Sequence, residues 1–372
     1  LDGRIETSTP KASTITRDKN GIATIFAPDR DAVAFSLGFI HSQERFFQMD
    51  LLRRNSAGEL SEIFGALALE HDKKVRIHQF RKRAHKYVAA LPPEHRSILE
   101  QYTRGVNEGL RQLTVKPVEY LLLSVTPNKW LPEDSMLVLY SMYMDLQYEF
   151  GQREQLLGLL QNNLLPDVFN FLTPQGSRWD AAIDNSQFLS SPIPDSKFEL
   201  VPMLNDLQVF KVNQEIKPFL DTAHEALAGS NSWVVAGSRT KTGAAMLAND
   251  MHLGIRMPNI WYRAGFRYQA QYSDATNKLV KSKNIKVDGV TLPGTPAMVV
   301  GSNRQIAWGF TNSYGDWSDV INLELDDSAT LYQTPTGFKK LTVSTEVIRV
   351  KGQQPVTVDI QNTIWGPVIG KS

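Results

Sequence analysis

The residue of this chain whose type and position most clearly suggest a reaction is Ser230. It follows two small residues, the second of them Gly229. Two apolar runs come after it, over 233–236 and 244–248, with a Thr-Lys-Thr-Gly turn between them. The pattern predicts a strand, a hairpin and a second strand. It places Ser230 at the start of the first strand and His252 just past the second.

Two interpretations of Ser230 follow from the local pattern. A serine hydroxyl behind small residues has open access to the preceding carbonyl, here that of Gly229, and becomes a nucleophile when a neighbouring base takes its proton. An ordinary loop serine that merely opens a strand explains the same pattern more simply. The local residues alone therefore favour the second interpretation, and the rest of the chain must decide between the two.

The composition is that of a globular protein and argues against several kinds of partner. The chain has 372 residues, of which 42% are hydrophobic and 21% charged, enough for two domains or one large layered domain. A net charge of +1 gives no electrostatic basis for binding nucleic acid or an anionic membrane. No run of about 18 apolar residues is present to span a bilayer. The absence of cysteine excludes disulfides, thiolate metal sites and a cysteine nucleophile.

The N-terminal half has the spacing of a helical region behind a short hairpin. Residues 13–26 predict the hairpin, with an Asn-Gly turn. Apolar residues at helical spacing predict helices over three stretches, about 37–57, 73–113 (interrupted at two prolines) and 132–160. Within the first helix, His41 is expected to be a buried, hydrogen-bonded structural residue rather than a catalytic one.

From Ser230 onward the pattern changes to that of β-structure. Short apolar runs separated by Gly, Asn and Pro turns predict strands over 232–236, 244–248, 260–267, 297–300, 306–310, 319–325 and 341–350. Between the two halves, residues 186–229 contain a linker-like Ser-Ser-Pro-Ile-Pro-Asp stretch and no obligatory strand pattern. A helical half followed by a strand-rich half predicts an α+β protein.

Several motifs of the chain resemble those of one enzyme family. Around the serine they are Gly229-Ser-Asn-Ser-Trp-Val-Val and Leu247-Ala-Asn-Asp-Met-His-Leu253. Further along are Trp308-Gly-Phe-Thr-Asn312 and Asp316-Trp-Ser-Asp319, and upstream is the stretch Leu37-Gly-Phe-Ile-His-Ser-Gln-Glu-Arg-Phe-Phe-Gln-Met-Asp50. In this order, and over nearly the whole chain, they resemble the penicillin acylase family of N-terminal-nucleophile amidohydrolases.

The resemblance implies a fold and a division of the chain. The fold is the four-layer αββα sandwich of N-terminal-nucleophile hydrolases, with a helical small-subunit segment and Ser230 at the start of a central strand. Residues 1–204 correspond to the small (alpha) subunit, 205–229 to an excised spacer and 230–372 to the N-terminal part of the catalytic (beta) subunit. Because the family's catalytic chain continues further, this sequence is expected to be a fragment of a longer precursor and inactive by itself.

The family's chemistry gives Ser230 two roles. Members cut their own precursor before this serine, here between Gly229 and Ser230. The freed α-amine, with an unperturbed pKa of about 8, then serves as the base for the serine hydroxyl. By the same resemblance, His252 orients the amine or a water, and the backbone N–H of Asn312 forms half of the oxyanion hole. The other half, a side-chain amide, is expected beyond Ser372.

Metal and substrate residues are also implied by the resemblance. Asp316 and Asp319 are positioned like the family's calcium carboxylates, with Glu154 as the third, and no organic cofactor is expected. The residues that correspond to the walls of the acyl pocket are Met144, Tyr148, Leu253, Val300 and Phe310. Two of them replace a phenylalanine and a serine of phenylacetyl-preferring members, so an aliphatic acyl chain, as in N-acyl-homoserine lactones, is expected as readily as the side chain of a β-lactam. The simpler alternatives are a solvated acidic turn and plain core packing.

Two other functions stay open on the residues alone. A conventional serine hydrolase would use Ser230, His252 and Asp250, but no Gly-x-Ser-x-Gly elbow is present, and Asp250 is expected to lie too near His252 in an extended strand to point at it. The other is a non-catalytic, β-rich ligand-binding protein. Only the acylase interpretation requires cleavage before Ser230. It predicts an alpha/beta heterodimer that acts on a small N-acyl amide, in the periplasm or outside the cell.

Overall fold

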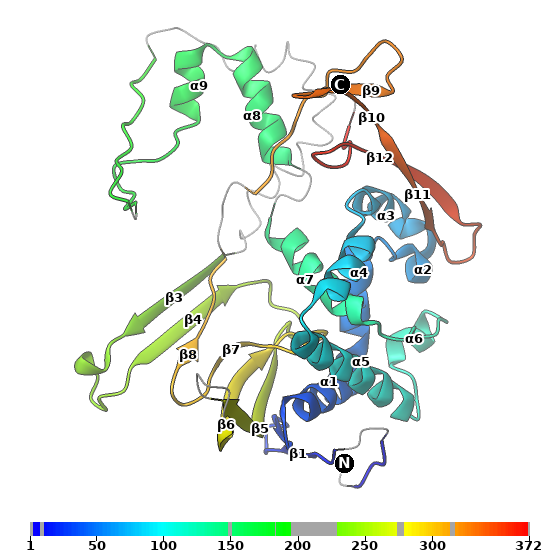
Figure 1. The fold of residues 1–372 in the computed structure, drawn as a ribbon, viewed down its shortest axis with the longest axis vertical. Helices are drawn as coiled ribbons and strands as arrows, with labels where there is room; N and C mark the ends of the chain where they lie inside the picture. Colours follow the sequence, from blue (N-terminus) through cyan, green and yellow to red (C-terminus); the bar gives the residue numbers. More distant parts are fainter. Residues whose placement is uncertain are drawn as a thin grey trace. The chain divides into compact units, whose positions relative to one another are not determined.

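The chain forms two compact units with mixed α+β structure (Figure 1). A computed structural model describes residues 3–7, 11–147, 151–182, 184–194, 229–273, 279–312 and 317–370. The larger unit comprises Leu1–Leu146, Gly229–Asn312 and Glu324–Ser372, and the smaller comprises Gln147–Ala228 and Ser313–Leu323. After an N-terminal hairpin, helices precede the other strands along the chain, as the sequence predicts. No helix among the described residues is long and apolar enough to cross a bilayer.

The helices of the larger unit begin with a long one at the N-terminal side. In chain order they are α1 (Arg30–Ala57), α2 (Ser61–Phe64), α3 (Leu69–Arg76), α4 (Phe80–Ala90), α5 (Pro93–Gln112), α6 (Val118–Leu122) and α7 (Pro132–Leu146), with a 3₁₀ turn at Gly65–Ala68. The Asp29 carboxylate caps the start of α1 by accepting a hydrogen bond from the Ala32 N–H, and Gly58 ends the helix in the left-handed region, at φ 64°. The predicted helix over 37–57 is confirmed and begins earlier, at Arg30. The helical stretch over 73–113 is confirmed with its break at the two prolines, and it has a further break before α4, where Gln79 has φ 50°.

The third predicted helix, over 132–160, is wrong in its extent. α7 ends at Leu146, and a separate helix, α8 (Gln152–Asn163), begins in the smaller unit and is followed by α9 (Pro166–Leu172). Gly151 precedes α8 with φ at 65°, a left-handed backbone conformation that cannot belong to a right-handed helix. The apolar spacing continues across this break, which is why periodicity alone did not reveal it.

Half of the described strands of the larger unit belong to a six-stranded sheet in the order β1-β2-β5-β6-β7-β8. These strands are β1 (Thr14–Arg17), β2 (Ala23–Phe26), β5 (Tyr262–Ser273), β6 (Leu279–Thr291), β7 (Met298–Ser302) and β8 (Ala307–Trp308). β2 and β5 run parallel, and the other neighbours are antiparallel. The hairpin predicted over 13–26 is therefore confirmed, and it joins strands from the second half of the chain in one sheet.

Three two-stranded sheets complete the described β-structure. They pair β3 (Gly229–Val235) with β4 (Met246–His252), β9 (Leu331–Thr334) with β10 (Gly337–Lys340), and β11 (Thr342–Ile348) with β12 (Val356–Asn362). A 3₁₀ turn, Gly237–Arg239, lies in the first hairpin. Two expectations are wrong. Among the described residues β3 pairs with β4 alone and is not a central strand, and the predicted strand over 319–325 contributes a single bridge, from Leu325 to Tyr332.

The main core lies where α1 and α5 pack together and against the six-stranded sheet. Leu37 and Tyr102 from the helices and Ile25 from the sheet are fully buried in it. The two helices approach closely because each has a glycine where it contacts the backbone of the other. A Cβ added to Gly38 would lie 2.2 Å from the Tyr102 carbonyl oxygen, and one added to Gly105 would lie 1.9 Å from that of Phe35. No larger residue fits at these two positions without separating the helices.

His41 is a structural residue of this core, as expected from the sequence. Its Nδ1 lies 2.8 Å from the Tyr102 hydroxyl and its Nε2 3.0 Å from the Thr291 hydroxyl. Because Thr291 donates its own proton to the Tyr262 carbonyl, its oxygen accepts from Nε2–H, and Nδ1 is left to accept from Tyr102. Burial, with a smaller contribution from the charge of Arg45, lowers the pKa of His41 to about 3. The imidazole is therefore neutral in the folded protein at neutral pH.

This neutral imidazole should make the protein less stable as the pH falls. Since the folded-state pKa of His41 is about 3 and the ordinary value 6.5, the unfolded chain binds one more proton than the folded protein between these values, and stability is lost below about pH 6.5. Between pH 7 and 5 the loss should be about 2 kcal/mol. Urea unfolding of the full-length protein at both pH values should show that His41→Gln removes this part of the pH dependence. Replacing the exposed His95 with glutamine should leave it intact.

Candidate functional site

The β3–β4 hairpin places Ser230 at the second position of its first strand. In the antiparallel register Ser230 lies opposite Met251, and Gly229 lies opposite His252. The predicted strand, hairpin and strand are confirmed, with Ser230 and His252 at the open end of the hairpin. Ser230 is half-buried, whereas Trp233 and Val234, further along the strand, are 56% and 70% exposed. The serine is thus the better protected part of its strand.

The residue that contacts the Ser230 hydroxyl comes from a distant part of the sequence. The backbone N–H of Asn312 donates a hydrogen bond to the Ser230 Oγ at 2.5 Å. Asn312 follows β8 at the end of the six-stranded sheet, so the chain after this sheet reaches the hairpin. An N–H that touches a serine oxygen also lies close to any oxygen carried by a carbon that the serine attacks. The structure therefore brings together two of the predicted site residues, 82 positions apart.

His252 pairs with Asp250 rather than with Ser230. Its Nε2 lies 3.0 Å from the Asp250 Oδ2, so the expectation that Asp250 cannot point at His252 is wrong. Two residues of the same face of a strand, i and i+2, are close enough for these side chains to meet when the strand ends in solvent. Both side chains are largely exposed, at 49% for His252 and 76% for Asp250.

The register separates His252 from the Ser230 hydroxyl. Directly opposed residues of an antiparallel pair share a face and neighbours along a strand alternate, so Gly229 and His252 face one way and Ser230 and Met251 the other. His252 lies across from Gly229, beside the peptide bond that precedes Ser230. Within the described part of the chain, no hydrogen bond joins the two side chains. This arrangement suits a residue near the serine's backbone nitrogen better than a base for its hydroxyl.

The predicted acyl-pocket residues occupy different elements of the larger unit. Met144 is buried near the end of α7, Leu253 packs against the main core just after β4, and Val300 is half-buried in β7. Phe310 is 60% exposed after β8, two residues before Asn312. Tyr148 lies outside the described residues. Leu253 therefore directly follows His252 and Phe310 lies near Asn312, whereas Met144 belongs to the helical part.

Of the predicted calcium ligands, Glu154 and Asp319 are described and both lie in the smaller unit. Glu154 stands in the first turn of α8 and pairs with Arg153 at 3.3 Å. Asp319 is exposed, and Asp316 lies outside the described residues. No group of three histidine or acidic side chains gathers in the part of the chain that is described.

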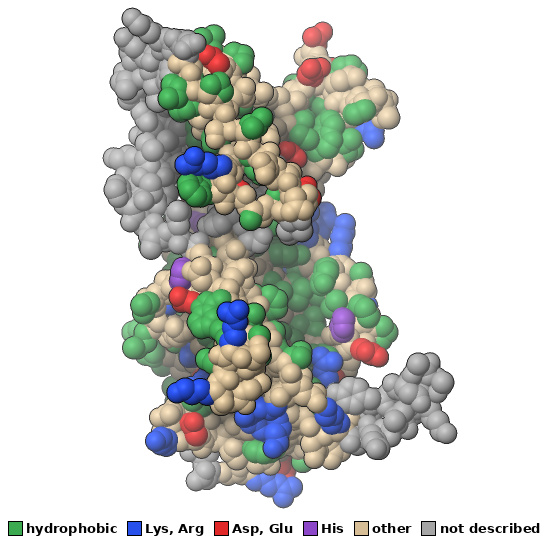
Figure 2. Space-filling model, turned by 90° about the vertical axis from the view of Figure 1, so that its left-hand side faces the viewer, with side chains coloured by type: hydrophobic (Ala, Val, Ile, Leu, Met, Phe, Trp, Pro, Cys, Tyr) green, Lys and Arg blue, Asp and Glu red, His purple; other side chains and the backbone are tan. Residues whose placement is uncertain are grey.

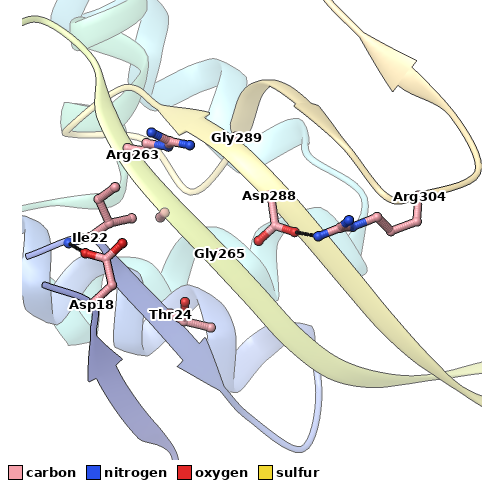
Figure 3. Close-up of a pocket in the computed structure, with 9 residues that line it drawn as sticks. Asp18, Ile22, Thr24, Arg263, Gly265, Asp288, Gly289 and Arg304 are labelled. Carbon is pink, nitrogen blue, oxygen red and sulfur yellow. Dashed lines mark hydrogen bonds and ion pairs between the residues drawn. The ribbon is translucent and has the colours of Figure 1, made fainter. Parts of the chain in front are cut away.

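A polar pocket of about 390 Å³ opens beside β5 in the six-stranded sheet (Figure 3). Its lining comprises Asp18, Ile22, Thr24, Arg263, Ala264, Gly265, Asp288, Gly289 and Arg304. Asp288 pairs with Arg304 at 3.0 Å and with Arg267 at 2.7 Å. Burial raises the pKa of Asp288, but its interactions with these two arginines outweigh burial and hold the pKa below its usual range. No sequence motif indicates this pocket, and none of the predicted site residues lines it.

Exposed charges of both signs lie on the side of the molecule drawn in Figure 2. On the side of the molecule drawn in Figure 2, hydrophobic and basic side chains are interspersed over the surface, with acidic ones between them. This distribution accords with a net charge of +1.

The chain is similar to known proteins of one family over nearly its whole length. The family model described as penicillin amidase matches residues 12–372. The acyl-homoserine lactone acylase QuiP of Pseudomonas aeruginosa is 28% identical over 341 residues, which cover 91% of this chain and 38% of that protein. The penicillin acylase 2 proenzyme of Pseudomonas sp. (strain SE83) is 28% identical, with 95% and 43% covered, and the penicillin G acylase of Escherichia coli is 24% identical, with 95% and 45% covered. The chain thus spans less than half the length of these relatives.

Proposed function

Since this chain belongs to the penicillin amidase family, we propose that the protein is an amidohydrolase that removes the acyl group from an N-acylated small molecule. One observation carries the proposal, the 2.5 Å hydrogen bond from the Asn312 N–H to the Ser230 Oγ. It supports the proposal because it places a backbone donor beside the proposed nucleophile, and both oxygens of a tetrahedral intermediate are bonded to the one carbon that the serine attacks. The names of the relatives cited above support two substrate classes, N-acyl-homoserine lactones and β-lactam amides.

Maturation precedes catalysis in this proposal. The Ser230 hydroxyl attacks the carbonyl carbon of Gly229, the peptide C–N bond breaks, and the nitrogen leaves as the α-amine while the acyl group passes to the oxygen. Water then hydrolyses this ester and frees the hydroxyl. The glycine supports the step because no side chain hinders the attack, and His252 lies across the hairpin from this bond. A relative named as a proenzyme agrees with this scheme.

Turnover then uses the freed α-amine as the base. The amine takes the proton of the Ser230 hydroxyl as the oxygen attacks the substrate's acyl carbon, and the Asn312 N–H binds the developing oxyanion. The C–N bond breaks as the leaving nitrogen receives the proton, which leaves an acyl-serine. Water, deprotonated by the same amine, releases the acyl group as a carboxylic acid. His252 is assigned the orientation of the amine or of this water.

The division of the chain follows the same proposal. Residues 1–204 form the small subunit, 205–229 the spacer and 230–372 the first part of the catalytic subunit, together a heterodimer with the αββα sandwich. Family membership supports this division, as does the hairpin that begins at Gly229. Apart from Gly229, the spacer lies outside the described residues. The family resemblance also supports a periplasmic or secreted location.

Hydrolysis assays test the proposed function directly. The full-length protein should release the acyl group from N-acyl-homoserine lactones, phenylacetyl amides or both, and should do so only after cleavage before Ser230. The alternative serine hydrolase has one favourable observation, the pairing of His252 with Asp250. That enzyme would need no cleavage. Activity in an uncut chain would therefore favour the alternative, and no activity on either substrate would contradict the proposal.

We also propose a structural calcium ion held by Glu154, Asp316 and Asp319. Support comes from the packing of the smaller unit. A Cβ added to Gly151 would lie 2.8 Å from the Val320 Cγ2, so the start of α8, which carries Glu154, lies against the segment that carries Asp319. Carboxylates from two segments provide the oxygen ligands that calcium prefers. When bound, the ion would link these segments, and it takes no part in the proposed reaction.

Chelation should reveal this ion through stability. The Tm of the full-length protein should fall when calcium is removed and recover when it is restored, because an ion that binds only the folded state stabilises it. Asp319→Asn should lower the Tm in calcium and abolish the effect of chelation. Replacing the exposed Asp327 with asparagine provides a matched loss of charge that should preserve the effect. If the Tm is the same with and without calcium, the proposed ion is contradicted, and Asp316 and Asp319 are better interpreted as a solvated acidic turn.

A further inference from the structure

We propose that Asn249 is a positioning residue, whose side-chain amide holds the segment after β8 so that the Asn312 N–H points at Ser230. The inference rests on the proposed function and extends it to a residue outside the reacting groups. Asn249 lies in β4 opposite Ser232, on the hairpin face that also carries Ser230. From this position it reaches the segment that supplies the oxyanion donor.

The Asn249 amide binds the backbone of Phe310 through both of its polar atoms. Its Nδ2 donates to the Phe310 carbonyl at 2.9 Å, and its Oδ1 accepts from the Phe310 N–H at 3.3 Å. The same Nδ2 also lies 3.3 Å from the Asn231 carbonyl of β3. One side chain thus makes the pair of hydrogen bonds that a neighbouring strand would make, and it joins both strands of the hairpin to the incoming segment.

A glycine lets this segment approach the amide. A Cβ added to Gly309 would lie 2.9 Å from the Cγ and Oδ1 of Asn249, a distance that forces one of them to move. The need for glycine here is steric, and it arises from Asn249 itself. Close approach and two reciprocal hydrogen bonds are independent signs that the segment is fitted to this side chain.

The two hydrogen bonds between Asn249 and the Phe310 backbone, here called the clamp, lie between strand β8 and the proposed oxyanion donor. On one side, β8 is paired with β7, and the Trp308 indole N–H donates to the Met298 carbonyl at 3.1 Å. On the other side, Asn312 lies two residues beyond Phe310 and meets the Ser230 Oγ. Losing the side chain of Asn249 removes both hydrogen bonds that hold the Phe310 backbone, two residues before the donor. Because a displacement of about 1 Å in a catalytic group costs about 10²-fold in rate, the effect should appear in turnover.

The test compares Asn249→Ala with a matched asparagine elsewhere. Asn107 makes the same reciprocal clamp, donating to the Trp130 carbonyl at 2.9 Å and accepting from the Trp130 N–H at 2.9 Å, in the helical part of the larger unit. Asn107→Ala therefore removes equivalent hydrogen bonds without touching the site. Gly309→Ala tests the clamp from its other side. The measurements are kcat, KM and the affinity for a boronic acid that carries the acyl group and forms a tetrahedral adduct with serine, all per processed molecule of full-length protein.

The proposal expects Asn249→Ala and Gly309→Ala to lower kcat by about 10²-fold with little change in KM, and to weaken boronate binding in parallel. Asn107→Ala should lower the Tm and leave kcat and boronate affinity unchanged. Wild-type turnover by both Asn249→Ala and Gly309→Ala, or equal loss in the Asn107 variant, would overturn the inference. If the wild-type protein shows no hydrolysis, or hydrolysis that Ser230→Ala does not abolish, the proposed function itself is contradicted. This result is distinct from a failure of the inference about Asn249.

Discussion

Replacing Ser230 with alanine should leave the full-length protein as one uncut chain without measurable amidase activity. Ser230 supplies the hydroxyl that attacks Gly229 during maturation and the amide bond during turnover, so both reactions lose their nucleophile. Loss of a serine nucleophile lowers kcat on the order of 10⁶-fold in a comparable system. Gel electrophoresis and intact mass should show a single chain, and hydrolysis should fall to the rate of the assay blank.

The neighbouring Ser232 provides the control for this substitution. It lies on the same face of β3 and donates a hydrogen bond to the Ala248 carbonyl at 3.2 Å. Ser232→Ala removes a hydroxyl of the same kind and should still be cut and active. If Ser230→Ala is split at the same bond, an external protease performs maturation. If it retains turnover, another residue is the nucleophile.

A second large effect is expected at Asp50, in a buried charge cluster on α1. Its Oδ1 accepts a hydrogen bond from the Arg53 Nε at 2.7 Å and lies 3.0 Å from the Arg54 Nε, while its Oδ2 accepts from the Tyr120 hydroxyl at 2.6 Å. Burial raises the pKa of Asp50, but the charges of Arg53 and Arg54 outweigh burial and hold the pKa below its usual range. Arg53 also pairs with Asp134 of α7 at 2.5 Å, so the cluster joins two helices.

Asp50→Ala should destabilise the protein by about 3–5 kcal/mol, because it leaves two buried guanidinium groups short of negative charge. It also leaves the Tyr120 hydroxyl without its acceptor. Urea unfolding of the full-length protein measures the loss. Glu70→Ala removes the exposed pair with Lys73 and should change stability by less than about 1 kcal/mol. If the two substitutions lower the free energy of unfolding equally, the buried charge cluster contributes no more to stability than an exposed ion pair.

The sequence predicted the elements whose apolar pattern matched their burial. The helix ended by Gly58 and the hairpin that carries Ser230 were predicted because the side-chain periods of helix and strand are visible in their residues. β6 was missed because its sequence, Leu-Val-Lys-Ser-Lys-Asn-Ile-Lys-Val-Asp-Gly-Val-Thr, contains many charged residues and no short apolar run. The break at Gly151 was missed because only its backbone angle distinguishes it.

The candidate site was predicted only where a motif contained its residues. Ser230 and Asn312 were named from the family resemblance, since no local pattern connects positions so far apart. The expectation that Asp250 does not easily point at His252 is wrong because it applies strand geometry to an exposed strand end, where side chains can turn toward each other. Asn249 stood inside a quoted motif, yet its role depends on the path of the chain after β8, which sequence spacing does not encode.

The N-terminal residue of the active protein's second chain tests the central claim most directly. If Ser230 is an N-terminal nucleophile, N-terminal sequencing and intact mass of active, full-length protein should find a chain that begins Ser-Asn-Ser-Trp-Val, with a free α-amine at Ser230. The appearance of this chain should parallel the appearance of hydrolysis during maturation. An active protein whose chain is continuous through Gly229 and Ser230, or whose second chain begins elsewhere, would contradict the account.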